Sequence, residues 1–249
     1  MARLPALTRF FNGLGHRVAY FYVRRLMLSD IEWPADMPAG PKIIAANHPT
    51  TSDPFFLMSW PFGPIHILIA ESVFKVPVLG HFLGLAGHIP VYADRGREAF
   101  YSALSLLAGG HTVGVFPEGS LSEDDGQILT ARTGAVRMAV TEKVPIVPAG
   151  IALDWHFVRR RQMQQSGVTE KMRWFWLGAY EVTIGDPLVF DHGHDDKQAV
   201  RRSTDTLMSE IERLVERSAQ RLLDKSWPLR TSPHAADGAA RGWSEPSAR

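Results

Sequence analysis

The sequence predicts an α/β fold, in which a mixed, largely parallel central sheet is flanked by helices, with an N-terminal amphipathic helix and a C-terminal helix. Short apolar runs alternate with segments of helical periodicity, as in parallel sheets built from βαβ units. Three of these runs end in polar residues that can bind ligands, as strands of open α/β sheets do. We expect three parts: an N-terminal helix and linker (1–40), an α/β domain (41–226) and a disordered tail (227–249).

The composition narrows the class of protein. A net charge of +1 gives no overall field that attracts nucleic acid, so we expect no nucleic-acid partner. The absence of cysteine excludes disulfides and thiolate catalysis, and it fits a reducing compartment. The longest stretches without Asp, Glu, Lys or Arg, 54–70 and 99–117, contain proline or glycine and do not predict membrane-spanning helices. A histidine and aspartate cluster at 192–196 is interpreted as a solvated helix cap, so no metal is expected.

The first helix is expected over residues 6–28, with two possible roles for its apolar stripe. Residues 1–30 contain five arginines and one acid, which favours the surface of an anionic membrane, on its cytoplasmic face. The alternative is that the stripe packs onto the protein's own core. Gly13 and Gly15 argue against one straight helix. The stripe comprises Leu7, Phe10, Phe11, Leu14, Val18, Phe21, Tyr22 and Leu26.

The remaining elements follow from periodicity and breaker residues. A linker is expected at 29–41, strands at 43–46, 65–70, 88–92, 112–116, 145–151 and 180–184, and helices at 54–60, 97–107, 133–141 and 195–223, with short irregular helices at 71–84. Two prolines in 145–151 predict an irregular or edge strand. Basic and aromatic residues over 155–176 are interpreted as a lipid-facing or surface-packed patch rather than a nucleic-acid site.

His48 and Asp53 lie in the loop that follows the strand at 43–46. On a helix a spacing of five would turn them about 140° apart, so only a bent loop can bring the two side chains together. A carboxylate bonded to one imidazole nitrogen fixes the tautomer and leaves the other nitrogen as a base. Asp53-Pro54 is also typical of a helix start, with Asp53 as the N-cap. Taken alone, such a pair is more often an ordinary loop histidine beside a helix cap.

Two further strands end in residues with useful chemistry. Tyr92 leads to Arg95, and Phe116 leads to Glu118 and Gly119. Because carboxyl ends of parallel strands face one side of a sheet, one cleft could hold a base, a cation and a glycine turn. Arg95 offers a fork matched to phosphate, although an isolated arginine is more often a surface residue. These patterns do not identify the reaction.

Four ordered segments within residues 42–151 carry a resemblance to a known family. They are Asn47-His48-Pro49-Thr50-Thr51-Ser52-Asp53, Gly87–Gly96, Phe116-Pro117-Glu118-Gly119-Ser120 and Val144–Ile151. Together they resemble the NHxxxxD-type glycerolipid acyltransferases, a group that includes the 1-acylglycerol-3-phosphate O-acyltransferases. One departure is Leu121, where the family often has arginine. Arg132 is the candidate replacement for a basic residue that commonly precedes the Gly134 position.

The resemblance implies a mechanism and a set of site residues. His48 would act as general base, oriented by Asp53, while Arg95 holds the acceptor's phosphate and Glu118-Gly119 shape the acceptor site. The other implied substrate-binding residues are Asn47, Ser120 and Arg132. Backbone amides near Gly119 or of the neighbours of Pro148 are candidate oxyanion donors.

The implied donor is acyl-CoA or acyl-carrier protein, with no cofactor. The implied acceptor is 1-acylglycerol-3-phosphate, which would become phosphatidic acid. Glycerol-3-phosphate, another lyso-lipid or an amino-lipid are alternative acceptors, and a non-catalytic lipid-binding protein is the alternative of a different class. A serine hydrolase is not expected, because no G-x-S-x-G sequence is present.

Overall fold

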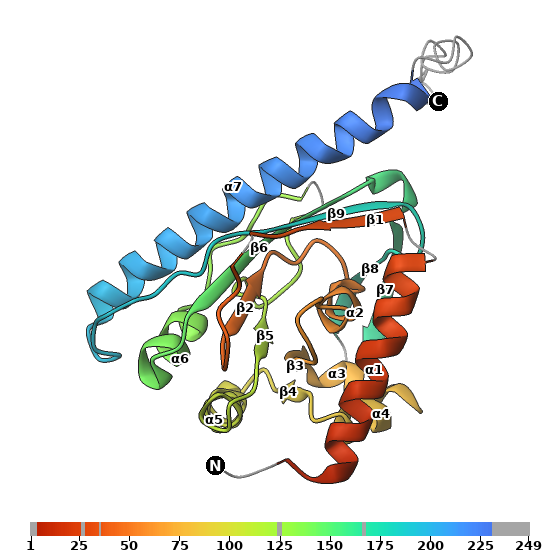
Figure 1. Ribbon diagram of the computed structural model, residues 1–249. Helices are drawn as coiled ribbons and strands as arrows, with labels where there is room; N and C mark the ends of the chain where they lie inside the picture. Colours follow the sequence, from red (N-terminus) through yellow and green to blue (C-terminus); the bar gives the residue numbers. More distant parts are fainter. Residues whose placement is uncertain (1–3, 26–27, 35, 124–125, 166–167, 231–249) are drawn as a thin grey trace, which may run out of the picture.

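A seven-stranded sheet in the order β1-β9-β6-β2-β5-β3-β4 lies at the centre of the protein, with helices on both faces (Figure 1). The computed structural model describes residues 4–25, 28–34, 36–123, 126–165 and 168–230. Its strands are β1 (Leu28–Glu32), β2 (Ile43–Ala46), β3 (His66–Ala70), β4 (Ile89–Val91), β5 (Val113–Val115), β6 (Ile146–Leu153) and β9 (Ala179–Ile184). A separate hairpin pairs β7 (Arg159–Gln165) with β8 (Val168–Trp174). The predicted fold class is confirmed.

The helices form two layers, each with its own apolar core. One layer contains α1 (Ala6–Arg25), α2 (Asp53–Met58), α3 (Glu71–Phe74) and α4 (Leu79–Leu85). The other contains α5 (Gly96–Ala108), α6 (Gly134–Glu142) and the long α7 (Lys197–Arg230), and a short 3-10 turn, η1 (Trp155–Phe157), follows β6. Strand β2 alternates between the two cores: Ile44 and Ala46 pack in the first, Ile43 and Ala45 in the second.

Strand directions bring the candidate residues to one edge of the sheet. Strands β2, β3, β4, β5 and β6 are mutually parallel, whereas β9 is antiparallel to β6 and carries β1 in parallel with itself. The carboxyl ends of β2, β4, β5 and β6 therefore lie at the same edge, where the amino end of β9 meets them. This is the arrangement in which open α/β sheets bind ligands.

Two regions depart from the sequence prediction. Strand β1 lies in the expected linker 29–41, where its polar Ser29, Asp30 and Glu32 gave no strand pattern. It forms by pairing with β9, from Leu28 opposite Ala179 to Glu32 opposite Thr183. The β7–β8 hairpin lies in the predicted basic and aromatic patch, where its strands bond mainly to each other.

Strand β6 is internal, so the predicted irregular or edge position is wrong. It pairs with β2 through residues 146–149 and with β9 through residues 149–153. Pro148 is tolerated because of where its nitrogen faces. The Pro148 carbonyl accepts a hydrogen bond from the Gly185 N–H (2.9 Å), just beyond β9. The Pro148 nitrogen therefore faces the β9 side of β6, at a position before the pairing with β9 begins, so its missing N–H removes no hydrogen bond between the two strands.

Helix α7 crosses the sheet diagonally and extends beyond it (Figure 1). It approaches β6 at Gly150, where an ideal Cβ would lie 2.2 Å from the Leu214 main chain, so only glycine fits. Asp196 accepts a hydrogen bond from the Ala199 N–H (2.9 Å) at the start of α7, which confirms the helix-cap interpretation. Because α7 includes residues 227–230, the predicted tail begins too early. Residues 231–249 lie outside the described residues.

Most of the apolar stripe of α1 faces outward, whereas Phe11 packs on Phe82 and Tyr22 packs against the first core. Phe10, Val18 and Phe21 are each more than 60% exposed. The side against the protein carries small residues, and a Cβ at Gly15 would lie 2.8 Å from Phe82. Core packing of the whole stripe is therefore ruled out among the described residues, which exclude Leu26. No helix in the described ranges combines the length and apolar character needed to cross a bilayer.

Candidate active site

The loop between β2 and α2 brings His48 and Asp53 together, as the bent-loop prediction requires. His48 Nδ1 lies 2.8 Å from Asp53 Oδ2, with 16% of the histidine side chain exposed and the aspartate fully buried. Asp53 is the first residue of α2 and not its N-cap; Ser52 takes that position and its carbonyl accepts from the Phe55 N–H (2.9 Å). The N-cap prediction is wrong because the Asp53 carboxylate turns inward, toward the loop.

Both oxygens of Asp53 are occupied by donors. Oδ2 accepts from His48 and from the Thr50 N–H (2.7 Å), and Oδ1 accepts from the Thr50 hydroxyl (2.5 Å) and the Tyr180 hydroxyl (3.2 Å). Burial, followed by the nearby Asp53 charge, raises the pKa of Tyr180 well above its usual value, so the phenol stays a proton donor. The carboxylate is thus held in one orientation, with a lone pair directed at Nδ1.

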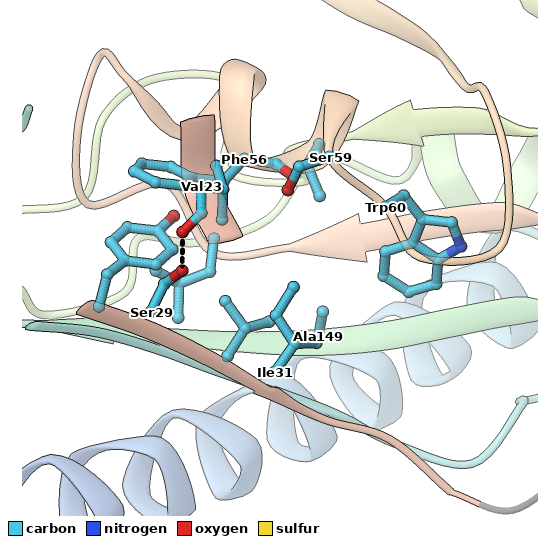
Figure 2. Close-up of a pocket in the computed structure, with 11 residues that line it drawn as sticks. Val23, Ser29, Ile31, Phe56, Ser59, Trp60 and Ala149 are labelled. Carbon is cyan, nitrogen blue, oxygen red and sulfur yellow. Dashed lines mark hydrogen bonds between the residues drawn. The ribbon is translucent and has the colours of Figure 1, made fainter. Parts of the chain in front are cut away.

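A small apolar cavity lies behind this carboxylate, between α1, α2 and the β1, β9 and β6 strands (Figure 2). Tyr180 and Phe56, stacked with ring centroids 3.6 Å apart, line it on the side of the loop. Ser29 Oγ donates to the Val23 carbonyl (2.6 Å) and joins the end of α1 to β1 at its wall. The apolar lining accounts for the desolvation of the Tyr180 hydroxyl.

Phe116 fixes the plane of the His48 ring. The two rings stack with centroids 4.0 Å apart and an interplanar angle of 14°. Asp53 fixes Nδ1, and among the described residues no hydrogen-bond partner occupies Nε2. The imidazole therefore has one nitrogen held by the protein and one available to a substrate.

Glu118 joins the turn after β5 to the loop that carries His48. The carboxylate is 4% exposed and accepts from the His48 N–H (2.8 Å), the Ser122 hydroxyl (3.0 Å) and the Leu129 N–H (2.8 Å). These three donors are internal. Glu118 therefore holds the main chain of His48, and its part in shaping the acceptor site stays a prediction.

Gly119 and Arg132 come together beside this turn. Gly119 has φ +71, a conformation that favours glycine, and a Cβ there would lie 2.7 Å from Nε of the exposed Arg132 side chain. Its N–H donates to the Phe116 carbonyl (3.0 Å), which removes this amide from the candidate oxyanion donors. Arg132 and Ser120 are exposed at the edge of the sheet.

Asn47 bonds to β6 at the start of the loop. It is 2% exposed, its Nδ2 donates to the Ile151 carbonyl (3.0 Å), and its Oδ1 accepts from the Ile151 N–H (2.8 Å). The side-chain amide thus continues the β2–β6 pairing for one more step. Asn47 therefore anchors the loop to β6, and its substrate-binding role stays a prediction.

Arg95 lies at the end of β4, separated from β2 by β5 and β3. Its guanidinium stacks over the Tyr92 ring at 4.1 Å and is half exposed, with Glu98 and Asp94 oxygens at 3.5 and 3.8 Å. It shares the edge with His48 without touching it. The exposed guanidinium is open to a charged group from solvent.

Three contact residues were missed by sequence reasoning: Thr50, Phe116 and Tyr180. Thr50 lies inside the recognised motif, and its hydroxyl was the available signal. Phe116 was predicted to end a strand, but its stacking on His48 is a contact between distant segments. Tyr180 is 127 residues from Asp53 along the chain, and nothing in its surroundings pointed to the loop.

Residues 29–152, from β1 to the end of β6, match the sequence profile of the family described as Acyltransferase. The chain belongs to this acyltransferase family. The match contains the whole His48–Asp53 loop and the Arg95 and Glu118 turns. It ends before the β7–β8 hairpin.

Named relatives agree with this family assignment. A 1-acyl-sn-glycerol-3-phosphate acyltransferase of Bacillus subtilis is 26% identical over 159 residues, which are 63% of this chain and 71% of the relative. Enzymes of the same name from Limnanthes douglasii (32%) and Saccharomyces cerevisiae (30%) match 45% and 53% of this chain, and the chain spans 42% and 46% of their lengths. The crystal structure of the 1-acyl-sn-glycerophosphate acyltransferase PlsC from Thermotoga maritima shares the fold, with a TM-score of 0.56, 20% identity and coverage of 84% of this chain and 78% of that chain.

Proposed function

We propose that this acyltransferase moves a fatty acyl group from acyl-CoA or acyl-carrier protein to the free hydroxyl of 1-acylglycerol-3-phosphate, which yields phosphatidic acid. The observation that carries the proposal is the His48 ring, oriented by buried Asp53 and Phe116 and with Nε2 available. The activity for which the relatives are named supports the acceptor.

In the proposed reaction Nε2 of His48 takes the proton of the acceptor hydroxyl as its oxygen attacks the thioester carbonyl. The resulting imidazolium is stabilised by Asp53 through Nδ1–H. Collapse of the tetrahedral intermediate breaks the C–S bond, and the departing thiolate takes the proton back from His48. The histidine is thereby restored, and the products are an ester and a free thiol.

The hydroxyl groups of the protein support direct transfer without an acyl-enzyme intermediate. Thr50 bonds to Asp53, the Thr51 and Ser52 oxygens accept from β8 and the segment that follows it, and Ser122 bonds to Glu118. Among the described residues none of these hydroxyls contacts the His48 ring. A nucleophile activated by His48 must therefore come from the substrate.

The exposed cations at the same edge support a phosphorylated acceptor. Arg95 and Arg132 end on either side of the β5 turn, and neither guanidinium is buried. A guanidinium binds a phosphate through two parallel N–H donors. The buried Glu118 carboxylate adds no exposed negative charge to this edge.

We also propose that the protein works as a peripheral protein on the cytoplasmic face of a membrane. The outward apolar stripe of α1 is flanked by Arg17, Arg24 and Arg25, a combination suited to anionic headgroups and the acyl boundary beneath them. This position would place a lyso-lipid acceptor at the protein surface. Replacing Phe10 and Phe21 with serine should reduce sedimentation with anionic liposomes, and unchanged sedimentation would contradict the proposal.

Thiol release tests the reaction. Acyl-CoA and acyl-carrier protein are each supplied with 1-acylglycerol-3-phosphate, glycerol-3-phosphate, or a lyso-lipid without a phosphate monoester. We expect the fastest release with 1-acylglycerol-3-phosphate and none above background in folded His48→Ala. Turnover near the wild-type rate in that variant refutes the assignment, and lipid binding without any thiol release favours a non-catalytic lipid-binding protein.

A further inference from the structure

Arg173 is a buried cation close to the catalytic loop that the proposed reaction does not use. It lies on β8, is 3% exposed, and its guanidinium faces the Trp155 ring at 5.8 Å. Nη1 donates to the Glu123 carbonyl (2.6 Å) and Nη2 donates to the Ser122 carbonyl. Burying a guanidinium is costly unless its donors are used, so this placement requires these carbonyls.

The main chain around Arg173 is bonded to the catalytic loop itself. The Thr51 N–H donates to the Arg173 carbonyl (2.7 Å), and the Arg173 N–H donates to the Thr51 hydroxyl (3.0 Å). Two residues further on, the Phe175 N–H donates to the Ser52 hydroxyl (3.0 Å). The end of β8 therefore runs alongside the part of the loop that connects His48 to α2 and bonds to it as a neighbouring strand would.

Ser122 closes a ring of contacts between these parts. Its N–H donates to the His48 carbonyl (2.9 Å), and its hydroxyl donates to Glu118, which also accepts from the His48 N–H. The path runs from Thr51 through Arg173 to Ser122 and back to His48. Arg173 thus bonds directly to the Thr51 end of the segment and is linked to the His48 end through Ser122.

We propose that Arg173 is a positioning residue for acyl transfer: it fixes the loop that carries His48 against the turn that carries Glu118. The inference rests on the proposed function, and it concerns a residue outside the segment matched by the family, which ends at residue 152. The role needs a planar fork, because two carbonyls from successive residues accept from two nitrogens of one group. A lysine ammonium can reach one of them with good geometry and so replaces the arginine only in part.

Arg160 supplies a matched control. It is directly opposite Arg173 in the β7–β8 register and faces the same Trp155 ring at 5.9 Å, but it is exposed. Arg160→Met removes a cation from the same strand pair without touching the ring of contacts. Leu207→Ala, in α7 within the second core, supplies a variant destabilised away from the site.

Steady-state kinetics on the full chain are the first test, with rates expressed per folded molecule. Arg173→Met should lower kcat by about 10- to 100-fold with KM within about threefold, because a shift of about 1 Å in a catalytic group has that effect. Arg173→Lys should recover part of the loss, and Arg160→Met should equal wild type. Unchanged kcat in Arg173→Met overturns the proposal, and so does an equal loss of kcat in Leu207→Ala. If Arg173→Met does not fold, a wild-type kcat in Arg173→Lys overturns the proposal.

Amide hydrogen exchange without substrate is the second test, and it does not depend on the reaction. Peptides covering 48–53 and 118–123 should exchange faster in folded Arg173→Met or Arg173→Lys than in Arg160→Met, while core peptides stay the same. Equal exchange in these peptides overturns the positioning role. If wild type transfers no acyl group, the proposed function fails, and the exchange comparison still decides what Arg173 holds.

Discussion

Two fully buried carboxylates, Asp53 and Glu181, are held by opposite means. Glu181, on β9 beneath α7, accepts a hydrogen bond from Lys225 Nζ (2.7 Å) and forms an ion pair with Arg221 Nη2 (2.8 Å). Both cations also reach Asp30 on β1 at 3.0 Å. Asp53 is surrounded by the uncharged donors of Thr50 and Tyr180 and by the His48 ring. One carboxylate lies in an ion cluster, the other in a cage of neutral donors.

The difference separates stability from catalysis. The charge of Glu181 is already balanced in the folded protein, so its whole contribution is to hold α7 on the sheet. The charge of Asp53 gains a full counter-charge only when His48 takes a proton, which is the step that the proposed reaction requires. An interaction that strengthens during the reaction accelerates it, whereas one that is complete beforehand does not.

Replacing Asp53 with asparagine should have the largest effect and test the catalytic half of the comparison. The amide keeps the shape but can no longer stabilise an imidazolium or fix its tautomer, so kcat should fall by about 10³- to 10⁴-fold. Thiol release measures the loss. Asp195→Asn, at a 93% exposed carboxylate, is the control, and a fall of less than tenfold in Asp53→Asn would contradict the role.

Glu181→Gln should lower stability and leave kcat unchanged, the reverse of Asp53→Asn. Replacing the buried carboxylate with an amide leaves the Arg221 and Lys225 cations without its negative charge. The free energy of unfolding should therefore fall by about 3 kcal/mol. Urea denaturation measures this change, and kcat per folded molecule should stay at the wild-type value. A selective loss of kcat would show that the two carboxylates are not separable.

Arg95→Ala tests whether an arginine that contacts neither Asp53 nor Glu181 binds the substrate. Its carboxylate neighbours lie at 3.5 and 3.8 Å and are exposed, unlike the close partners of Arg221, so Arg95 should be available to a phosphate. We expect KM for the phosphorylated acceptor to rise by about tenfold, the size of one charge-assisted hydrogen bond, with KM for the thioester unchanged. A rise confined to the thioester would move Arg95 to the donor side.

The smallest expected effect is a pH dependence of stability from the ion cluster. Burial raises the pKa of Asp30, but the hydrogen bond and charge of Lys225 and the charge of Arg221 lower it by more. The pKa of a free aspartate is about 3.9. The stability contributed by the Asp30–Lys225 pair is therefore present above that pH and is lost as the pH falls through the depressed pKa of Asp30. Melting temperatures should therefore fall less steeply with acid in Lys225→Met than in wild type; parallel curves would exclude the pair as a source.

Local sequence patterns were enough to predict the parallel strands and the three strand ends, because β2 and β5 are continuous apolar runs buried on both faces. They failed where a partner is distant. Strand β1 exists because β9 pairs with it, and Asp53 turns inward because Thr50 and Tyr180 supply donors there. The Asp-Pro pattern correctly placed the helix start, but tertiary hydrogen bonds outweighed the capping preference of Asp53.

The contact of α7 with Gly150 also has a consequence for how the protein is made. Strand β9 and helix α7 are the last described elements to be synthesised, yet one pairs with β1 and the other covers the second core. Until they emerge from the ribosome, β1 has no partner and the apolar face of β6 stays open to solvent. Long-range pairing of this kind is slow and exposes the nascent chain to aggregation. The last described elements, one of which carries Tyr180, therefore decide when the sheet and the second core are completed during translation.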